Sequence, residues 1–111
     1  MDKEEAISKA TSYVNRAKQL LEYDKAILFG SYIYGKPRED SDLDVAFIVK
    51  KIKKNSDYLE LLSRLTKLAS EVDTRIEPHV MEEKDKTGFK EYIFKKGYII
   101  SNWVIISYYK R

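Results

Sequence analysis

Residues 25–49 read KAILFGSYIYGKPREDSDLDVAFIV and hold two short apolar runs with a polar segment between them. The first run, residues 25–29, stops at Gly30, and the second, residues 42–49, begins with DLD and is apolar afterwards. Short apolar runs that are bounded by glycine and polar residues are typical of buried strands. We therefore predict two neighbouring strands, the second of which is acidic where it begins.

Gly30 and Ser31 follow the first apolar run directly. A glycine after a strand lets the backbone come close to a ligand, and the N-terminus of a following helix directs free N–H groups toward an anion. Ser31 suits the N-cap of a brief helical turn through Ile33, and it adds a hydroxyl group. We therefore predict that Gly30 and Ser31 bind phosphate groups.

Asp42 and Asp44 begin the second predicted strand. Because side chains alternate along a strand, both carboxylates are expected on one face, with Leu43 and Val45 on the other. Two carboxylates at this spacing can bind a hard cation through their oxygen atoms. A phosphate-binding strand end beside such a pair describes a site for a metal ion and a nucleoside triphosphate. Either part alone is common, whereas the combination is far more specific.

A third strand is predicted over residues 75–81, with Pro78 indicating an edge position. Glu77 and His79 share one face of this strand. If Glu77 faces the two aspartates, it can hold a second metal ion and accept the proton of an attacking hydroxyl group. For His79 we favour the commoner role of a histidine that is packed and hydrogen-bonded within the fold.

Helical spacing of apolar residues surrounds these strands. Asp2 and Glu5 suggest a capping box for a first helix that extends to about Leu21. The same spacing predicts helices over residues 56–72 and 87–96. Each of these segments has one apolar face, which must pack against a sheet or another helix.

The last part of the chain adds strands to this pattern. Gly97 is expected as the C′ residue of the preceding helix. Residues 98–100 and 103–109 are strand-like. Helices therefore alternate with strands along the chain, and the fold class is α/β (α+β), a small mixed β-sheet flanked by helices.

The segment GSYIYGKPREDSDLDVAF, residues 30–47, resembles the GS-x10-DxD signature of minimal nucleotidyltransferases in the DNA polymerase β-like nucleotidyltransferase superfamily. The ten residues from Tyr32 to Ser41 match the spacing of that signature. The sequence KEYIFKKGYII, residues 90–100, is similar to the helix-glycine-strand ending of these domains. The resemblance covers roughly the first hundred residues and implies the nucleotidyltransferase fold.

The resemblance also implies roles for individual residues. Asp42 and Asp44 would be the Mg²⁺ ligands, and Gly30 and Ser31 the phosphate-binding pair. The third carboxylate of the family, commonly an aspartate, falls on Glu77. Together the three carboxylates would form a catalytic site for two Mg²⁺ ions, with ATP as the substrate.

The activity implied by the resemblance is transfer of a nucleoside monophosphate from a triphosphate to an acceptor hydroxyl, with release of pyrophosphate. Small stand-alone members commonly pair with a HEPN-domain toxin and act as its antitoxin by adenylylating it. We therefore expect a protein adenylyltransferase with a HEPN partner and a tyrosine hydroxyl as acceptor. Two alternatives stay open: transfer to a small-molecule hydroxyl with a partner subunit supplying the binding region, and a non-catalytic antitoxin that only binds its partner.

The composition of the chain argues against several other classes of function. The 111 residues suffice for one domain, 1–111, and the absence of cysteine excludes disulfides and thiolate chemistry. The single histidine makes a Ser-His-Asp triad hard to build, and a net charge of +3 is too even to indicate direct nucleic-acid binding. The charged N-terminus and the short apolar runs predict a soluble, cytoplasmic protein without membrane segments. The aromatic tail, 102–111, could pack on the domain or form an interface with a partner or a second copy.

Overall fold

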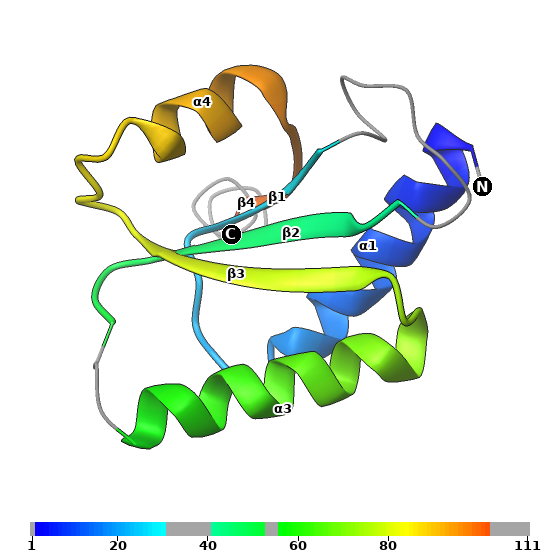
Figure 1. Ribbon diagram of the computed structural model, residues 1–111, viewed down its shortest axis with the longest axis horizontal. Helices are drawn as coiled ribbons and strands as arrows, with labels where there is room; N and C mark the ends of the chain where they lie inside the picture. The colour runs from blue at the N-terminus through cyan, green and yellow to red at the C-terminus, as the bar shows by residue number, and fades with distance from the viewer. Residues whose placement is uncertain (1, 31–40, 53–55, 103–111) are drawn as a thin grey trace, which may run out of the picture.

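The computed structural model describes residues 2–30, 41–52 and 56–102. Within them, three helices accompany four strands (Figure 1). In chain order these are α1 (Lys3–Ala17), β1 (Lys25–Phe29), β2 (Leu43–Val49), α3 (Ser56–Val72), β3 (Ile76–Glu82), α4 (Phe89–Lys96) and β4 (Tyr98–Asn102). The predicted α/β class with a small mixed sheet is confirmed.

The four described strands form one sheet in the order β3-β2-β1-β4. Strand β1 runs antiparallel to both β2 and β4, whereas β2 and β3 are parallel. The helix α3 supplies the crossover that a parallel pair requires. Strand β3 lies at the edge of the sheet, as Pro78 within it predicted, because proline cannot donate a hydrogen bond to a further strand.

Helices cover both faces of the sheet (Figure 1). The larger apolar cluster joins one face to α1 and α3, and it includes Leu43, Val45 and Phe47 of β2. The smaller cluster joins the other face to α4, and it includes Ala46 and Ile48 of the same strand. The predicted alternation of faces along this strand is therefore confirmed.

The ring of Phe47 lies at the centre of the larger cluster. Its centroid is 5.7 Å from that of Tyr13 and 5.2 Å from that of Tyr23. Both tyrosines are buried, and each hydroxyl donates a hydrogen bond to a backbone carbonyl: Tyr13 to Leu65 at 2.9 Å and Tyr23 to Val14 at 3.0 Å. Because buried polar groups are costly when unpaired, these bonds let aromatic residues fill the core. The bond from Tyr13 also links α1 to α3.

Helix α1 begins where the sequence predicted and ends earlier. Asp2 is its N-cap, and the Asp2 carboxylate accepts a hydrogen bond of 2.8 Å from the backbone N–H of Glu5. The helix stops at Ala17, not near Leu21 as predicted. The backbone N–H of Leu20 donates to the carbonyl of Ala17, so the last turn tightens and redirects the chain toward β1.

Helix α3 spans the predicted residues, whereas α4 begins two residues later than predicted. Gly88 precedes α4 with a φ of +88°, a left-handed conformation that sets the start of the helix at Phe89. Gly97 is the C-cap and not the C′ residue, and its φ is −86°. A Cβ at Gly97 would lie 2.5 Å from Cγ2 of Ile27, so close packing on β1, and not a left-handed turn, requires glycine here.

Several predictions concern parts of the chain outside the described residues. They are the short helical turn from Ser31 through Ile33, the strand at 103–109, and the interface role of the aromatic tail. Among the described helices, none combines the length and the apolar character that a membrane-spanning segment requires.

Candidate active site

Two strand ends bring Gly30 next to Asp44. Phe29, the last residue of β1, pairs with Asp44 near the start of β2. Gly30 follows with a φ of +98°, which side-chain-bearing residues rarely adopt. A Cβ at Gly30 would lie 2.7 Å from Oδ2 of Asp44, closer than real Cβ contacts come. Glycine therefore leaves room for the carboxylate and exposes the backbone beside it.

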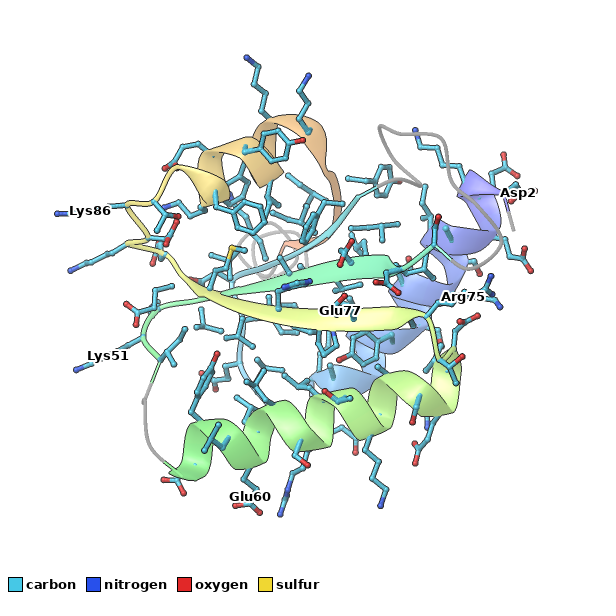
Figure 2. The ribbon with its side chains drawn as sticks, in the orientation of Figure 1. Asp2, Lys51, Glu60, Arg75, Glu77 and Lys86 are labelled. Carbon is cyan, nitrogen blue, oxygen red and sulfur yellow. The ribbon has the colours of Figure 1, made fainter. Side chains whose placement is uncertain are left out.

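The parallel pairing of β2 and β3 places Glu77 opposite Asp44. Glu77 projects from the edge strand β3, close to where that strand begins (Figure 2). Residues that pair in this way point to the same face of a sheet, so the two carboxylates share a face. In the prediction from the sequence, this was the condition for Glu77 to join the site. One ligand atom from each of Asp44, Glu77 and His79 lies within 4.8 Å of the other two.

His79 is the member of this group for which the sequence analysis favoured a purely structural role. Its Nε2 atom lies 3.1 Å from Oδ1 of Asp44, within hydrogen-bond distance. The ring of Phe29 packs against the imidazole, with the ring centroids 5.3 Å apart. The signal for this contact was present in the sequence, because His79 shares a strand face with Glu77; its distance from Asp44 depends on the parallel register.

The donor set of this group fits a divalent cation. Two carboxylates supply oxygen ligands and negative charge, and the imidazole supplies a nitrogen ligand. The side chains of Asp44 and His79 are 23% and 31% exposed, and Glu77 is exposed, so an ion can reach all three from solvent. Crowded carboxylates repel one another, and a cation would offset that repulsion.

Asp42 and Ser31 are not part of this converging group as the structure describes it. Asp42 precedes β2, which begins at Leu43; its side chain is exposed, and it is not among the three residues whose ligand atoms converge. Ser31 lies outside the described residues. The structure therefore brings together three of the predicted site residues, Gly30, Asp44 and Glu77.

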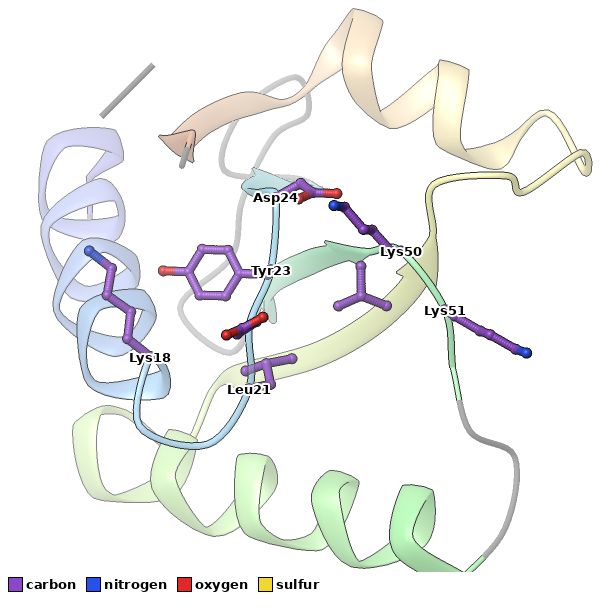
Figure 3. Close-up of a pocket in the computed structure, with 8 residues that line it drawn as sticks. Lys18, Leu21, Tyr23, Asp24, Lys50 and Lys51 are labelled. Carbon is purple, nitrogen blue, oxygen red and sulfur yellow. The ribbon is translucent and has the colours of Figure 1, made fainter. Parts of the chain in front are cut away.

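A large hollow in the described part of the molecule lies at the opposite end of the central strands (Figure 3). It measures about 700 Å³, and its lining includes Asp24, which precedes β1, and Val49, which ends β2. Gly30 and Asp44 occupy the other ends of these two strands. This hollow therefore contributes no residue to the candidate active site.

The structure combines a small mixed sheet with a glycine at one strand end and carboxylates that face each other on the next two strands, in agreement with the nucleotidyltransferase class that the sequence signature indicates. The comparison with known families agrees. The family model described as "Polymerase beta, Nucleotidyltransferase" matches residues 11–102, which include every candidate site residue. The chain belongs to this nucleotidyltransferase family.

Individual proteins of known name or structure also resemble this chain. A protein of Methanocaldococcus jannaschii, named as a candidate protein adenylyltransferase, is 30% identical over 74 residues, which cover 67% of this chain and 75% of that protein. The crystal structure of a candidate nucleotidyltransferase from Sulfolobus solfataricus superposes with a TM-score of 0.64 at 21% identity, over 90% of this chain and 83% of that chain.

A third similar structure comes from a complex. It contains the tri-AMPylated HEPN toxin of Shewanella oneidensis bound to an MNT antitoxin, and the matching chain has a TM-score of 0.53 at 22% identity. The match covers 84% of this chain and 72% of that chain. At these identities, the two solved structures establish a shared fold.

Proposed function

We propose that this chain transfers AMP from ATP to a hydroxyl group of a partner protein. The observation that carries the proposal is the convergence of Asp44 and Glu77 beside Gly30, at adjoining ends of β1, β2 and β3. Carboxylates at this position can bind the cations that accompany a triphosphate. The open backbone at Gly30 can approach a phosphate group, with Ser31 as the next residue in the chain.

The relatives support a protein as the acceptor. The M. jannaschii relative is named for protein adenylylation, and the S. oneidensis toxin carries AMP groups in its complex. We propose that the acceptor of this chain is likewise a HEPN-domain toxin, that the modified group is a tyrosine hydroxyl, and that modification neutralises the toxin. The chain would then be the antitoxin of the pair.

In the proposed reaction, the acceptor oxygen forms a bond to the α-phosphorus of ATP. The bond between that phosphorus and the oxygen bridging to the β-phosphate breaks, and pyrophosphate leaves. The proton of the acceptor hydroxyl passes to the carboxylate of Glu77, which is exposed and faces Asp44. Gly30 and Ser31 hold the phosphate groups in line with the acceptor.

The carboxylates of Asp44 and Glu77 converge where a divalent cation can bind, and we propose that a second cation binds beside them. Mg²⁺ is the ion that ATP ordinarily brings. Asp42 and Asp44 would hold the ion that accompanies the triphosphate, and Asp44 and Glu77 would hold the ion on the acceptor side. When bound, such ions offset negative charge on the triphosphate and on the departing pyrophosphate. Asp44 is shared by both positions in this proposal.

The direct test is to incubate the chain with ATP labelled at the α-phosphate, a divalent cation and the candidate HEPN partner. We expect label on the partner with the wild type and none with Asp44→Asn. Glu60→Gln is a matched control, because Glu60 lies on α3, its side chain is 59% exposed, and it forms an exposed pair with Arg64 of the same helix. This control should transfer label as the wild type does.

Other outcomes would separate the alternatives. Label on a small-molecule hydroxyl, with none on the partner, would contradict the protein acceptor and support the second enzyme hypothesis. Tight binding and inhibition of the partner by both wild type and Asp44→Asn, with no transfer from any nucleoside triphosphate, would contradict the catalytic proposal and support a binding antitoxin.

A further inference from the structure

We propose that His79 is a metal ligand, and that it makes the cation position between Asp44 and Glu77 select Mn²⁺ or a similar transition-metal ion over Mg²⁺. The inference rests on the proposed function, since it concerns the acceptor-side cation of the same site. It adds a nitrogen ligand to a site that the sequence predicted to contain carboxylates alone.

The strand register brings His79 into reach of Asp44. His79 pairs with Ala46 in the parallel ladder, two residues along from the pairing of Glu77 with Asp44. Because the residue across from His79 on β2 is alanine, its short side chain leaves the imidazole room on that side. The imidazole can therefore reach diagonally to Asp44, and its Nε2 atom lies 3.1 Å from Oδ1 of that carboxylate.

The aromatic ring of Phe29 holds the imidazole in place. Phe29 is only 6% exposed, and its ring centroid lies 5.3 Å from that of His79 at an interplanar angle of 53°. Phe29 also pairs with Asp44 across β1 and β2. The buried ring thus packs against the ligand histidine while its backbone neighbours the ligand aspartate. Support of this kind fixes the orientation of metal ligands.

The contact between His79 and Asp44 is compatible with metal binding. Nε2 of a histidine carries either a proton or a free lone pair, and only the second form binds a metal. In the absence of an ion, a proton on Nε2 serves the hydrogen bond to Asp44. A cation bound by both groups takes the place of that proton. The same atom therefore points to the same position in both states.

The donor set determines which cation is favoured. Mg²⁺ prefers oxygen ligands in a near-ideal octahedral arrangement and gives up water reluctantly. Imidazole nitrogen suits first-row transition metals, whereas carboxylates accept Mg²⁺ and Mn²⁺ alike. Exchanging one oxygen ligand for the nitrogen of His79 therefore shifts the selectivity of this position toward Mn²⁺. The position beside Asp42 keeps only oxygen donors and remains suited to Mg²⁺.

The composition of the chain makes a direct test simple, because His79 is the only histidine. The full chain, prepared without a histidine tag, is loaded with Mn²⁺ in the presence of a non-hydrolysable ATP analogue. Pulsed electron paramagnetic resonance then reports nitrogen nuclei coupled to the ion. We expect an imidazole ¹⁴N coupling that changes to a ¹⁵N coupling when only histidine is labelled with ¹⁵N. This readout needs no mutation and no turnover.

Two variants then test the selectivity. His79→Gln should bind Mn²⁺ about tenfold more weakly or worse, and His79→Asp should lose the nitrogen coupling while its Mn²⁺-to-Mg²⁺ affinity ratio falls. Glu60→Gln, on the α3 side of the molecule, should retain the wild-type ratio. Circular dichroism checks that each variant is folded.

Two results would overturn the inference: bound Mn²⁺ without histidine-derived nitrogen coupling, or an unchanged Mn²⁺-to-Mg²⁺ ratio in folded His79→Gln. Neither result would contradict the proposed function, which requires only that the site binds a divalent cation and transfers AMP. If the wild type bound neither ion in the presence of nucleotide, the proposed function would fail together with the inference.

Discussion

Gly30 and Asp44 approach each other so closely that a methyl group on Gly30 would lie 2.7 Å from Oδ2 of the aspartate. The contact joins the residue proposed to meet phosphate with the residue proposed to hold both cations. Glycine is required at position 30 for two separate reasons, a positive φ of 98° and this close approach.

Gly30→Ala should therefore lower adenylyl transfer by about 100-fold, because the added Cβ displaces a carboxylate that must be positioned accurately. The strained φ should also lower the free energy of unfolding by about 1–3 kcal/mol. Transfer of α-labelled phosphate and urea denaturation measure the two effects. Gly88→Ala is the matched control, because Gly88 has a φ of +88° with open space around its Cβ position. It should lose stability and keep its activity; equal loss of activity in both variants would contradict the account.

The transfer activity is predicted to depend on the carboxylate of Glu77 more than on the length of its side chain. Glu77→Gln should reduce transfer by about 10²–10⁴-fold, because the amide cannot accept the acceptor proton and is a weaker cation ligand. Glu77→Asp keeps the charge one methylene further back and should retain most activity, within about tenfold. Steady-state transfer rates distinguish the two. Equal activity of Glu77→Gln and the wild type would remove Glu77 from the site.

Asp73 is predicted to stabilise the fold at neutral pH. Its carboxylate, only 7% exposed, accepts hydrogen bonds from Arg75 and from Lys9, and Lys9 reaches it from α1. The hydrogen bond from the Arg75 side chain, more than that from Lys9, holds the pKa of Asp73 well below its usual range, against the opposing effect of burial. Asp73→Asn should lower the free energy of unfolding by about 2–3 kcal/mol at pH 7.

The same pKa shift sets the pH dependence of that stabilisation. Because the folded-state pKa of Asp73 is lowered, its contribution is fully present above the unfolded-state value of about 3.9 and is lost as the pH falls below it. The difference in the free energy of unfolding between the wild type and Asp73→Asn should therefore become smaller below about pH 4, as measured by acid denaturation. Glu71→Gln, in an exposed pair with Arg16, should change stability by less than about 0.5 kcal/mol. A gap that widened in acid would contradict this assignment.

Tyr13 is predicted to limit stability at alkaline pH. Burial raises the pKa of its hydroxyl above the usual value of about 10, and the hydroxyl donates to the carbonyl of Leu65. The stability that this neutral group contributes is therefore present below about pH 10 and is lost as the pH rises further. Tyr13→Phe should lower the free energy of unfolding by about 1–2 kcal/mol near pH 7. Above pH 10, the stability of this variant should fall less steeply than that of the wild type, as followed by urea denaturation. Tyr98→Phe, at a residue that is 44% exposed, should decline as the wild type does.

Much of the fold followed from local sequence signals. The apolar runs of β1 and β2 and the helical spacing of α3 predicted those elements closely, because each signal is contained in a few consecutive residues. The end of α1 was predicted too late. Leu20 and Leu21 continue the apolar spacing, yet they pack against the core from a turn after the helix. Spacing alone does not separate these two arrangements.

The candidate site, like the fold, was predicted only in part from the sequence. The alternation of side chains predicted which residues share a face within each strand. That Glu77 faces Asp44 was only a condition of that prediction, and the register of β2 and β3 places the two residues opposite each other. The contact between His79 and Asp44 was not predicted, because it requires the parallel register of β2 and β3, which sets the small Ala46 opposite His79. Register between distant strands is set by tertiary packing, which a single sequence does not display.

The most direct measurement of the central claim compares two labels of ATP in one reaction with the HEPN partner. The account predicts that label at the α-phosphate is transferred to the partner, that label at the γ-phosphate is released as pyrophosphate, and that Asp44→Asn abolishes both. Label from the γ-phosphate on the partner, or undiminished α-label transfer by Asp44→Asn, would contradict nucleotidyl transfer at the site formed by Gly30, Asp44 and Glu77.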